Sequence, residues 1–246
     1  MKYISGRWTP WDEKAFQKKT YELLQLDLSN KKELKKELLN ETYLGAGLIY
    51  GRFAADDYDT KALLIEAGFI PCETSYDICL PRLDKYIIPN LYSLKKYPLT
   101  IEGEDSFEEI SAIASDRMFH FSRFHEDPKI PSELADKRLG LWVCDLKNQD
   151  NIISITYRNL NGVIISFMIC QKDNETVRFL LGGSRKGMEL HSPFFWGSVI
   201  SYWQEKGMKK ITTTISAANI GVVNIYSNLG FVFNNVKIDY HKHIDV

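Results

Sequence analysis

Residues 216–231 read SAANIGVVNIYSNLGF, and the interpretation of the whole chain starts from this stretch. Its apolar residues recur at helical spacing, and Gly230 ends the helix because glycine tolerates the left-handed conformation that helix ends adopt. The spacing also groups Tyr226 with Val222 and Leu229 on one helix face. Taken alone, this pattern predicts that Tyr226 is a core residue.

The stretch has a counterpart near the start of the chain. A shift of 162 residues places Gly68 on Gly230 and lays RFAADDYDTKALLIEAGF over TISAANIGVVNIYSNLGF. Both copies predict a helix, a glycine cap, an aromatic residue and a strand. We interpret this echo as an internal duplication, with a coincidence of turn chemistry as the alternative. Leu64 stands where the later copy has Tyr226, so the earlier copy lacks the polar group.

Hydrophobic patterning around the opening stretch predicts a mixed α/β fold. The second half reads β-β-β-α-β-α-β and is preceded by two helices. The lysine-rich residues 11–40 are helical in character, and residues 81–99, with three prolines, resemble a linker. The predicted strands of the second half are 152–158, 162–170, 176–184, 209–216 and 231–243, and its predicted helices are 106–119, 132–148, 192–207 and the opening stretch.

Composition excludes several classes of protein. The chain has 246 residues, 26% of them charged and 44% hydrophobic, with a formal net charge of -1. This balance gives no overall field for nucleic acid or anionic membranes, and we expect neither as a partner. The N-terminus lacks the apolar stretch of a signal peptide, and four widely spaced cysteines suit buried reduced thiols, so we expect a cytoplasmic protein. A homodimer is left open.

Residues 176–197, TVRFLLGGSRKGMELHSPFFWG, predict an apolar strand, a glycine-rich turn and a helix. Glycine lets backbone N–H groups turn outward, and a helix start offers free amides and a positive dipole end. Arg185 and Lys186 add positive charge. We therefore expect an anion here, with pyrophosphate as the natural guest, although an ordinary exposed loop is the alternative. The stretch is neither a phosphate-binding loop of the Gly-Lys-Ser/Thr type nor GxGxxG.

The order of these segments resembles the acyl-CoA-dependent GNAT N-acetyltransferase family. The strand, loop and helix at 176–206 resemble that family's pyrophosphate-binding unit, and Asn219, Tyr226, Gly230 and Phe231 match its later pattern N-x6-Y-x3-GF. Within the family, the chain is most similar to the TDP-fucosamine acetyltransferase type. Shared features are the SRF loop in FSRFHEDPKIP, the LLGGSRKGMEL segment and a partial GNAT-like half in front of the full one.

The resemblance implies a fold and a division of the chain. It implies a central mixed, mostly antiparallel sheet flanked by helices, with an N-terminal partial GNAT-like domain over residues 1–98 and an acetyltransferase domain over residues 99–246. One departure stands out, because the family loop Gln/Arg-x-x-Gly-x-Gly/Ala does not fit residues 184–192. The cofactor loop is therefore assigned by order and composition.

The resemblance also implies the chemistry. The co-substrate is acetyl-CoA, no metal takes part, and an amine attacks the thioester. A backbone N–H in the strand would stabilise the oxyanion, and Tyr226 would protonate the departing thiolate, because a phenol stays protonated at neutral pH. The cofactor-binding residues expected are Leu180, Leu181, Gly182, Gly183, Arg185, Lys186, Gly187, Met188, Glu189, Leu190, Asn219, Asn224 and Tyr226.

The acceptor side is less specified. The loop FSRFHEDP offers Phe121, Arg123, Phe124 and His125 as substrate-binding residues, with the guanidinium pairing a diphosphate and a ring stacking on a nucleobase. The alternative is a loop packed by its own aromatic rings, with Arg123 paired to Asp127. His125 and Glu189 are candidates for the general base, and His125 is favoured as a positioning group.

The expected acceptor is the amino group of a nucleotide-linked (dTDP or UDP) deoxyamino sugar used in surface polysaccharide biosynthesis. Three alternatives remain: a GNAT acting on another amine or a peptide, a GNAT using a different acyl-CoA, and a non-catalytic protein that binds CoA or a nucleotide sugar. His241 and His243 lie near the end of the chain, and we interpret them as an exposed strand edge without a metal.

Overall fold

The computed structural model describes residues 3–40, 45–102 and 106–244. Strands of the described residues form one sheet, in which only two of the neighbouring pairs, β2 with β3 and β8 with β9, run parallel. The strands are β1 Ile4–Trp8, β2 Thr20–Leu26, β3 Leu48–Ala54, β4 Ile70–Leu80, β5 Leu99–Glu102, β6 Ile152–Arg158, β7 Ile164–Asp173, β8 Thr176–Ser184, β9 Lys210–Ser216 and β10 Val232–His243, in the spatial order β1-β2-β3-β10-β4-β9-β8-β7-β6-β5.

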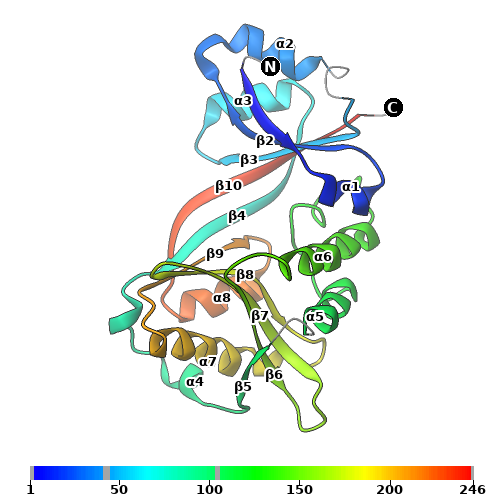
Figure 1. Ribbon diagram of the computed structural model, residues 1–246. Helices are drawn as coiled ribbons and strands as arrows, with labels where there is room; N and C mark the ends of the chain where they lie inside the picture. The colour runs from blue at the N-terminus through cyan, green and yellow to red at the C-terminus, as the bar shows by residue number, and fades with distance from the viewer. Residues whose placement is uncertain (1–2, 41–44, 103–105, 245–246) are drawn as a thin grey trace.

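Helices cover both faces of the C-terminal part of this sheet (Figure 1). The α-helices are α1 Pro10–Phe16, α2 Lys31–Leu39, α3 Tyr58–Glu66, α4 Asn90–Ser93, α5 Ser106–Ser115, α6 Ser132–Leu146, α7 Ser192–Glu205 and α8 Ile220–Asn228. One core cluster joins α5 and α6 to Phe167 and Ile169, and another joins α7 and α8 to Met168 and Cys170 on the opposite face. The predicted mixed, mostly antiparallel sheet flanked by helices is confirmed.

The two halves of the internal echo begin with the same local structure. Asp57 caps α3 by accepting a hydrogen bond from the backbone N–H of Thr60 at 3.0 Å. Asn219 caps α8 by accepting one from Val222 at 3.2 Å. Short oxygen-bearing side chains are the preferred N-caps, because they satisfy amides that have no partner within the helix.

The two helices also end alike. Gly68 and Gly230 both adopt a left-handed conformation, with φ of 85° and 68°. The next backbone N–H then returns to the helix, from Phe69 to the carbonyl of Leu64 at 2.9 Å and from Phe231 to that of Tyr226 at 3.0 Å. The sequence echo is therefore an echo of structure.

The sheet register obeys the same shift. Ser75 pairs with Lys237, and a shift of 162 residues maps this pair onto itself. The same shift maps the pair Arg52–Asp239 onto the pair Thr214–Asp77. The β-α-β units β3-α3-β4 and β9-α8-β10 are thus related by a local twofold axis between β4 and β10. Coincidence of turn chemistry does not extend to a shared strand register, so we conclude that the duplication is structural.

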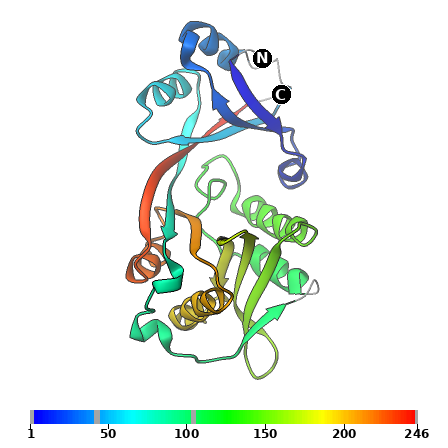
Figure 2. The same ribbon diagram turned by 60° about the vertical axis from the view of Figure 1, so that its left-hand side comes forward.

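Each unit places its second strand in the sheet of the other. β10 lies between β3 and β4, and β4 lies between β10 and β9. Figures 1 and 2 show these two long strands running through both lobes of the molecule. The segments 1–98 and 99–246, expected as two domains, therefore share one continuous sheet.

Three details of the first half and of the thiols differ from expectation. The helical interpretation of residues 11–40 is wrong between α1 and α2, where β2 (TYELLQL) pairs in parallel with β3 and buries Leu23. The linker 81–99 carries α4, which packs on α7. Cys144 is exposed on α6, contrary to the expected burial. Among the described residues, no helix combines the length and apolar character that crossing a membrane requires.

Candidate active site

β8 and β9 separate soon after they start. They pair in parallel over three positions, ending at Arg178 with Thr212, although β8 continues to Ser184 and β9 to Ser216. At the point of separation, the Thr213 hydroxyl donates to the carbonyl of Phe179 at 3.0 Å. Beyond it, β8 turns backbone groups toward the gap without a strand to pair with them.

A β-bulge lies in β8 beside this gap. Leu181 pairs with Ile169 and Phe179 pairs with Cys170, so Leu180 has no opposite residue in β7. A bulged residue is left out of the ladder, and bulges are frequent next to active sites. The predicted cofactor residues Leu180 and Leu181 thus lie where a free backbone N–H can face a developing oxyanion.

Tyr226 lies on the α7–α8 face of the sheet. It is 3% exposed, and its ring packs edge-on against Trp196 and Phe231, with ring centroids 6.4 and 4.7 Å away. Burial raises the pKa of Tyr226, and interactions with Trp196 and Thr213 oppose this only in part. The phenol therefore stays protonated at neutral pH, beside the threonine that marks the strand separation.

The two asparagines predicted to flank the CoA arm have different surroundings. The Asn219 side chain is occupied as the N-cap of α8. Asn224 is exposed on the same helix. Their predicted contacts with CoA stay predictions.

The opposite face of the sheet carries a cleft of about 850 Å³ between the two halves of the chain. The side chains of β9 alternate, so Thr214 and Ser216 line this cleft while Ile215 packs into the core on the α7–α8 side. Of the residues predicted from sequence, the cleft brings together Phe121, Arg123, Phe124, Leu180 and Leu181.

Arg123 is held by the N-terminal half. Its guanidinium forms ion pairs with Glu22 at 3.3 Å and with Asp239 at 3.4 Å, and it lies over the rings of Tyr50 and Phe124. The alternative pairing with Asp127 is wrong. Arg123 joins the loop to β2 and β10, and its charge is already shared with two carboxylates.

His125 does not line the cleft. Its ring nitrogens lie 2.8 Å from the Ser122 hydroxyl and 3.1 Å from an oxygen of Asp136, and its side chain is 3% exposed. This geometry fits the positioning role that the sequence favoured and disfavours direct contact with substrate.

The interpretation of His241 and His243 as an exposed strand edge is wrong. β10 is a central strand, and both rings meet the same oxygen of Asp127 at 2.7 Å. Asp127 also accepts the backbone N–H of Lys129 at 2.8 Å. This cluster fastens the loop 121–131 to β10, because a buried carboxylate with three donors is fully satisfied.

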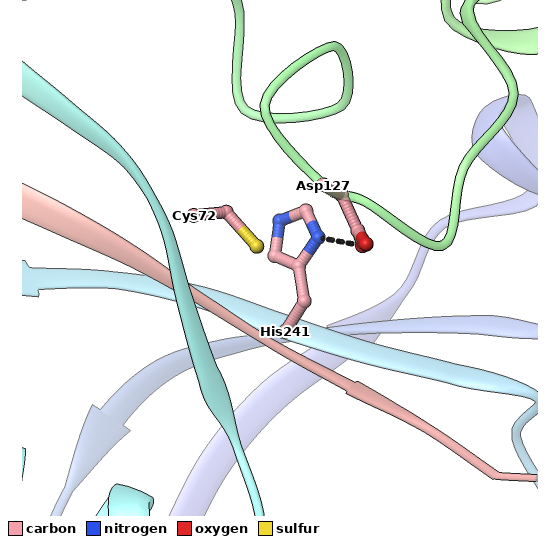
Figure 3. A group of neighbouring side chains, drawn as sticks. All are labelled: Cys72, Asp127 and His241. Carbon is pink, nitrogen blue, oxygen red and sulfur yellow. Dashed lines mark hydrogen bonds and ion pairs between the residues drawn. The ribbon is translucent and has the colours of Figure 1, made fainter.

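Cys72 lies against the same cluster. Figure 3 shows its thiol on the side of the His241 ring opposite Asp127. One donor atom from each of these three residues lies within 4.8 Å of the others, as a metal site would require. However, burial and the carboxylates of Asp127 and Asp239 raise the pKa of the Cys72 thiol, and a protonated thiol is not a metal ligand. The expected absence of a metal stays a prediction.

The loop predicted to bind pyrophosphate differs from the expected nest of free amides. Gly182 and Gly183 belong to β8, where an added Cβ would lie 2.5 Å from Met168 and 2.1 Å from Met118. Close packing explains these two glycines, and the prediction that they form a turn is wrong. Arg185 donates to the carbonyl of Ile164 at 3.0 Å and so points back to the sheet.

A carboxylate of the loop occupies one of its own amides. The backbone N–H of Gly187 donates to Glu189 at 2.9 Å, which lowers the pKa of Glu189. Lys186 and Leu190 are exposed, and Met188 packs against the core. Residues 184–192 therefore follow β8 and precede α7 as expected, but in this conformation they carry their own anion.

Sequence patterns did not indicate the N-terminal wall of the cleft. Arg7, Trp11 and Lys14 line it from β1 and α1, and Arg52 and Glu73 line it from β3 and β4. The duplication holds the only signal for Glu73. A bulge places Cys72 and Glu73 opposite Asp239, as the equivalent bulge places its two residues opposite Asp77.

Comparisons with known proteins agree with this geometry. No family model and no curated protein sequence matches the chain. Among solved structures, a GCN5-related N-acetyltransferase from Sphaerobacter thermophilus is 9% identical with a TM-score of 0.62, covering 99% of this chain and 78% of that one. A tandem GNAT protein from the clavulanic acid biosynthesis pathway is 10% identical with a TM-score of 0.60, covering 91% and 75%.

A third similar structure is a glucosamine N-acetyltransferase region of a fungal multi-domain GH3 β-N-acetylglucosaminidase. It is 13% identical with a TM-score of 0.66, covering 97% of this chain and 31% of that one. At such identities the likeness shows the fold alone. The chain has the fold of the GCN5-related N-acetyltransferases, with a second, partial copy of the same sheet-and-helix unit at its N-terminal end.

Proposed function

We propose that the protein is an acetyl-CoA-dependent N-acetyltransferase whose acceptor is the amino group of a nucleotide-linked deoxyamino sugar, used in surface polysaccharide biosynthesis. One observation carries the proposal of acetyl transfer. The separation of β8 and β9 opens between a buried tyrosine on one face of the sheet and a large cleft on the other. A thioester in the gap would be reached by an amine from the cleft and by an acid from α8.

In this mechanism the neutral amine attacks the thioester carbonyl, and the carbonyl electrons move onto oxygen. A backbone N–H near the bulge at Leu180 receives that charge. Collapse of the intermediate forms the amide and releases the thiolate, which takes the proton of Tyr226. The amine proton leaves into the cleft, and its return through water restores the phenol.

Glu73 is suited to receive the amine proton through water. It lines the cleft, whereas His125 and Glu189 do not. Burial raises the pKa of Glu73 to about 7, with Arg52 opposing the shift and Asp239 adding to it. A group with this pKa accepts a proton at neutral pH and releases it again readily.

The pH dependence of turnover tests this assignment. A carboxyl with a raised pKa is protonated below about pH 7, so we expect kcat to fall on that side. In Glu73→Gln this limb should disappear and turnover should drop about 10-fold or more. Glu126→Gln is the control, because Glu126 also has a raised pKa but bonds Ser216 and does not line the cleft. An unchanged limb in Glu73→Gln would exclude Glu73.

The sugar part of the proposal has two supports. The similar fungal region is named a glucosamine N-acetyltransferase, which acts on an amino sugar. The cleft is lined by both charged and aromatic side chains and is large enough for a substrate of that size. Another small amine or a peptide, and a different acyl-CoA, are the alternatives within acyl transfer.

A non-catalytic CoA or nucleotide-sugar binder is the second candidate, and one observation favours it. Glu189 fills an amide of the loop that should receive pyrophosphate. If acetyl-CoA uses this loop, the carboxylate must move away first. We therefore expect Glu189→Gln to tighten acetyl-CoA binding about 3- to 10-fold by calorimetry, because the anionic competitor is gone. Glu175→Gln is the control, since Glu175 is an exposed acid that pairs with Lys209 elsewhere on the surface. Weaker binding in Glu189→Gln would show that the carboxylate supports the loop.

A substrate panel tests the acceptor class. The protein is mixed with acetyl-CoA and with TDP- and UDP-linked 4-amino sugars, free amino sugars, polyamines and peptides, and the released thiol is followed. We expect turnover with the nucleotide-linked sugars. Turnover confined to polyamines or peptides would contradict the sugar proposal and leave acetyl transfer intact.

A further inference from the structure

The wall of the cleft formed by the N-terminal half has no role in the mechanism above. Arg7 comes from β1, and Trp11 and Lys14 come from α1. α1 packs against α6, so this short helix is held at the mouth of the cleft by the C-terminal half. Arg138 of α6 pairs with buried Asp12 at 2.7 Å, which fixes the face that α1 presents.

The charges that line the cleft are unequal. Its lining cations are Arg7, Lys14, Arg52, Arg123, Arg138 and Arg178, and its lining acids are Glu22, Glu73 and Asp145. Most of these cations are neutralised by ion pairs, such as Arg7 with Glu22 at 2.6 Å and Arg52 with Glu73 at 2.5 Å. Within the part of the chain that the structure describes, Lys14 and Arg178 are exposed and have no ion-pair partner. Two lining cations are thus left available for an anion.

Aromatic rings accompany the free cation on α1. The Arg7 guanidinium lies over the Trp11 ring, 5.4 Å from its centroid, and so forms a planar platform beside Lys14. Phe121, 41% exposed, lines the same cleft from the loop 119–124. Rings of this kind offer stacking surfaces for a flat, apolar group, while arginine and lysine pair with phosphate.

This wall is separate from the loop expected to take the pyrophosphate of acetyl-CoA. None of the described residues 184–192 lines the cleft. An anion bound at Lys14 would therefore be a different anion, carried by the acceptor. The cleft also holds Asp145, a lining carboxylate of α6 with no ion-pair partner among the described residues, which suits the cationic form of an amine.

We propose that Arg7, Trp11 and Lys14, with Phe121 opposite, form the acceptor-binding wall, and that it recognises a phosphate or diphosphate group next to a planar ring. The N-terminal copy of the duplicated unit has thus kept a role in recognition after losing the tyrosine position. This inference rests on the proposed function, because it assigns the acceptor end of the same cleft.

Calorimetry on the full chain at saturating acetyl-CoA tests the proposal. The probes are UDP and dTDP, inorganic pyrophosphate, and uridine or thymidine without phosphate. We expect the nucleoside diphosphates to bind with quenching of Trp11 fluorescence, pyrophosphate to bind more weakly, and the nucleosides to bind most weakly. Added salt should weaken diphosphate binding, because exposed charges are screened.

Matched variants locate the binding. Lys14→Glu should weaken diphosphate binding at least 10-fold while leaving acetyl-CoA affinity unchanged. Lys19→Glu is the control, because Lys19 is exposed nearby but does not line the cleft. Trp11→Leu should remove the fluorescence change. Equal losses in Lys14→Glu and Lys19→Glu would overturn the proposal, since a general charge effect would then explain them.

The outcomes separate this inference from the proposed function. If the protein acetylates amines but no nucleoside diphosphate binds, the wall proposal fails and acetyl transfer stands. If a nucleoside diphosphate binds in the Lys14-dependent way but no amine is acetylated, the wall is a binding site and the proposed activity fails.

Discussion

Tyr226→Phe should lower turnover by about 10²-fold or more while leaving acetyl-CoA affinity nearly unchanged. The substitution removes one hydroxyl from a ring packed between Trp196 and Phe231, so the core keeps its shape. Burial raises the pKa of Tyr226, which keeps the phenol as a proton donor throughout the neutral range. Steady-state kinetics with a calorimetric measurement of acetyl-CoA binding would check both parts of this expectation.

The chain offers a matched control at another buried tyrosine. Tyr240 is 1% exposed in the N-terminal core, and its hydroxyl has no hydrogen-bond partner within the described structure. Tyr240→Phe makes the same chemical change far from the strand separation, and should leave turnover within about twofold. Full activity in Tyr226→Phe would remove the acid role from this residue.

Asp127→Asn should destabilise the protein by about 2–3 kcal/mol. Its carboxylate accepts from His241 and His243 at 2.7 Å and carries the loop that supplies Phe121 and Arg123 to the cleft. An amide keeps the shape but loses the charge that strengthens these bonds, and its N–H₂ group faces donors. Urea unfolding followed by fluorescence would measure the loss.

The pH dependence of this effect has a defined sign. Burial by itself would raise the pKa of Asp127, but hydrogen bonds from His241 and His243 outweigh burial and hold the pKa well below its ordinary value. A carboxyl with a depressed pKa stabilises the fold above its unfolded pKa of about 4, and this contribution is lost as the pH falls further. Asp127→Asn should therefore flatten the acid side of the stability curve.

Asp116→Asn is the control for that variant. Asp116 is exposed after α5 and lies outside the cluster. Its replacement should change stability by less than about 0.5 kcal/mol. Equal stability losses in the two variants would contradict the anchoring role of Asp127.

The sequence predicted most of the C-terminal half, because its signals are local. Alternating apolar residues gave β6 to β9, and Asn219 and Gly230 marked the ends of α8 through cap geometry that depends on neighbouring residues alone. The shift of 162 residues identified the duplicated unit, and its register is repeated in the sheet. Repeated turn chemistry was a sufficient signal because both copies fold in the same way.

The remaining features depend on contacts between distant segments. The exchange of β4 and β10 buries His241 in the middle of a sheet, and no local pattern around that histidine indicates this. β2 was hidden among lysine-rich helical residues, since its strand is fixed by pairing with β3. Arg7, Trp11 and Lys14 reach the cleft only because α1 packs on α6.

The glycines of LLGGSRKG show how composition misleads. Gly182 and Gly183 are small because Met168 and Met118 pack onto β8, and their positions say nothing about phosphate. The bulge at Leu180, which does leave a backbone group free beside the gap, has no composition signal. Packing demands and binding demands select the same residue type, and only the strand register separates them.

Release of free CoA thiol from acetyl-CoA, measured with and without an amino-sugar nucleotide, tests the central claim most directly. We predict thiol release only when the amine is present, with one acetylated amine formed for each thiol. An absence of thiol release with every amine, together with no heat of acetyl-CoA binding, would contradict the assignment of acetyl transfer to the gap between β8 and β9.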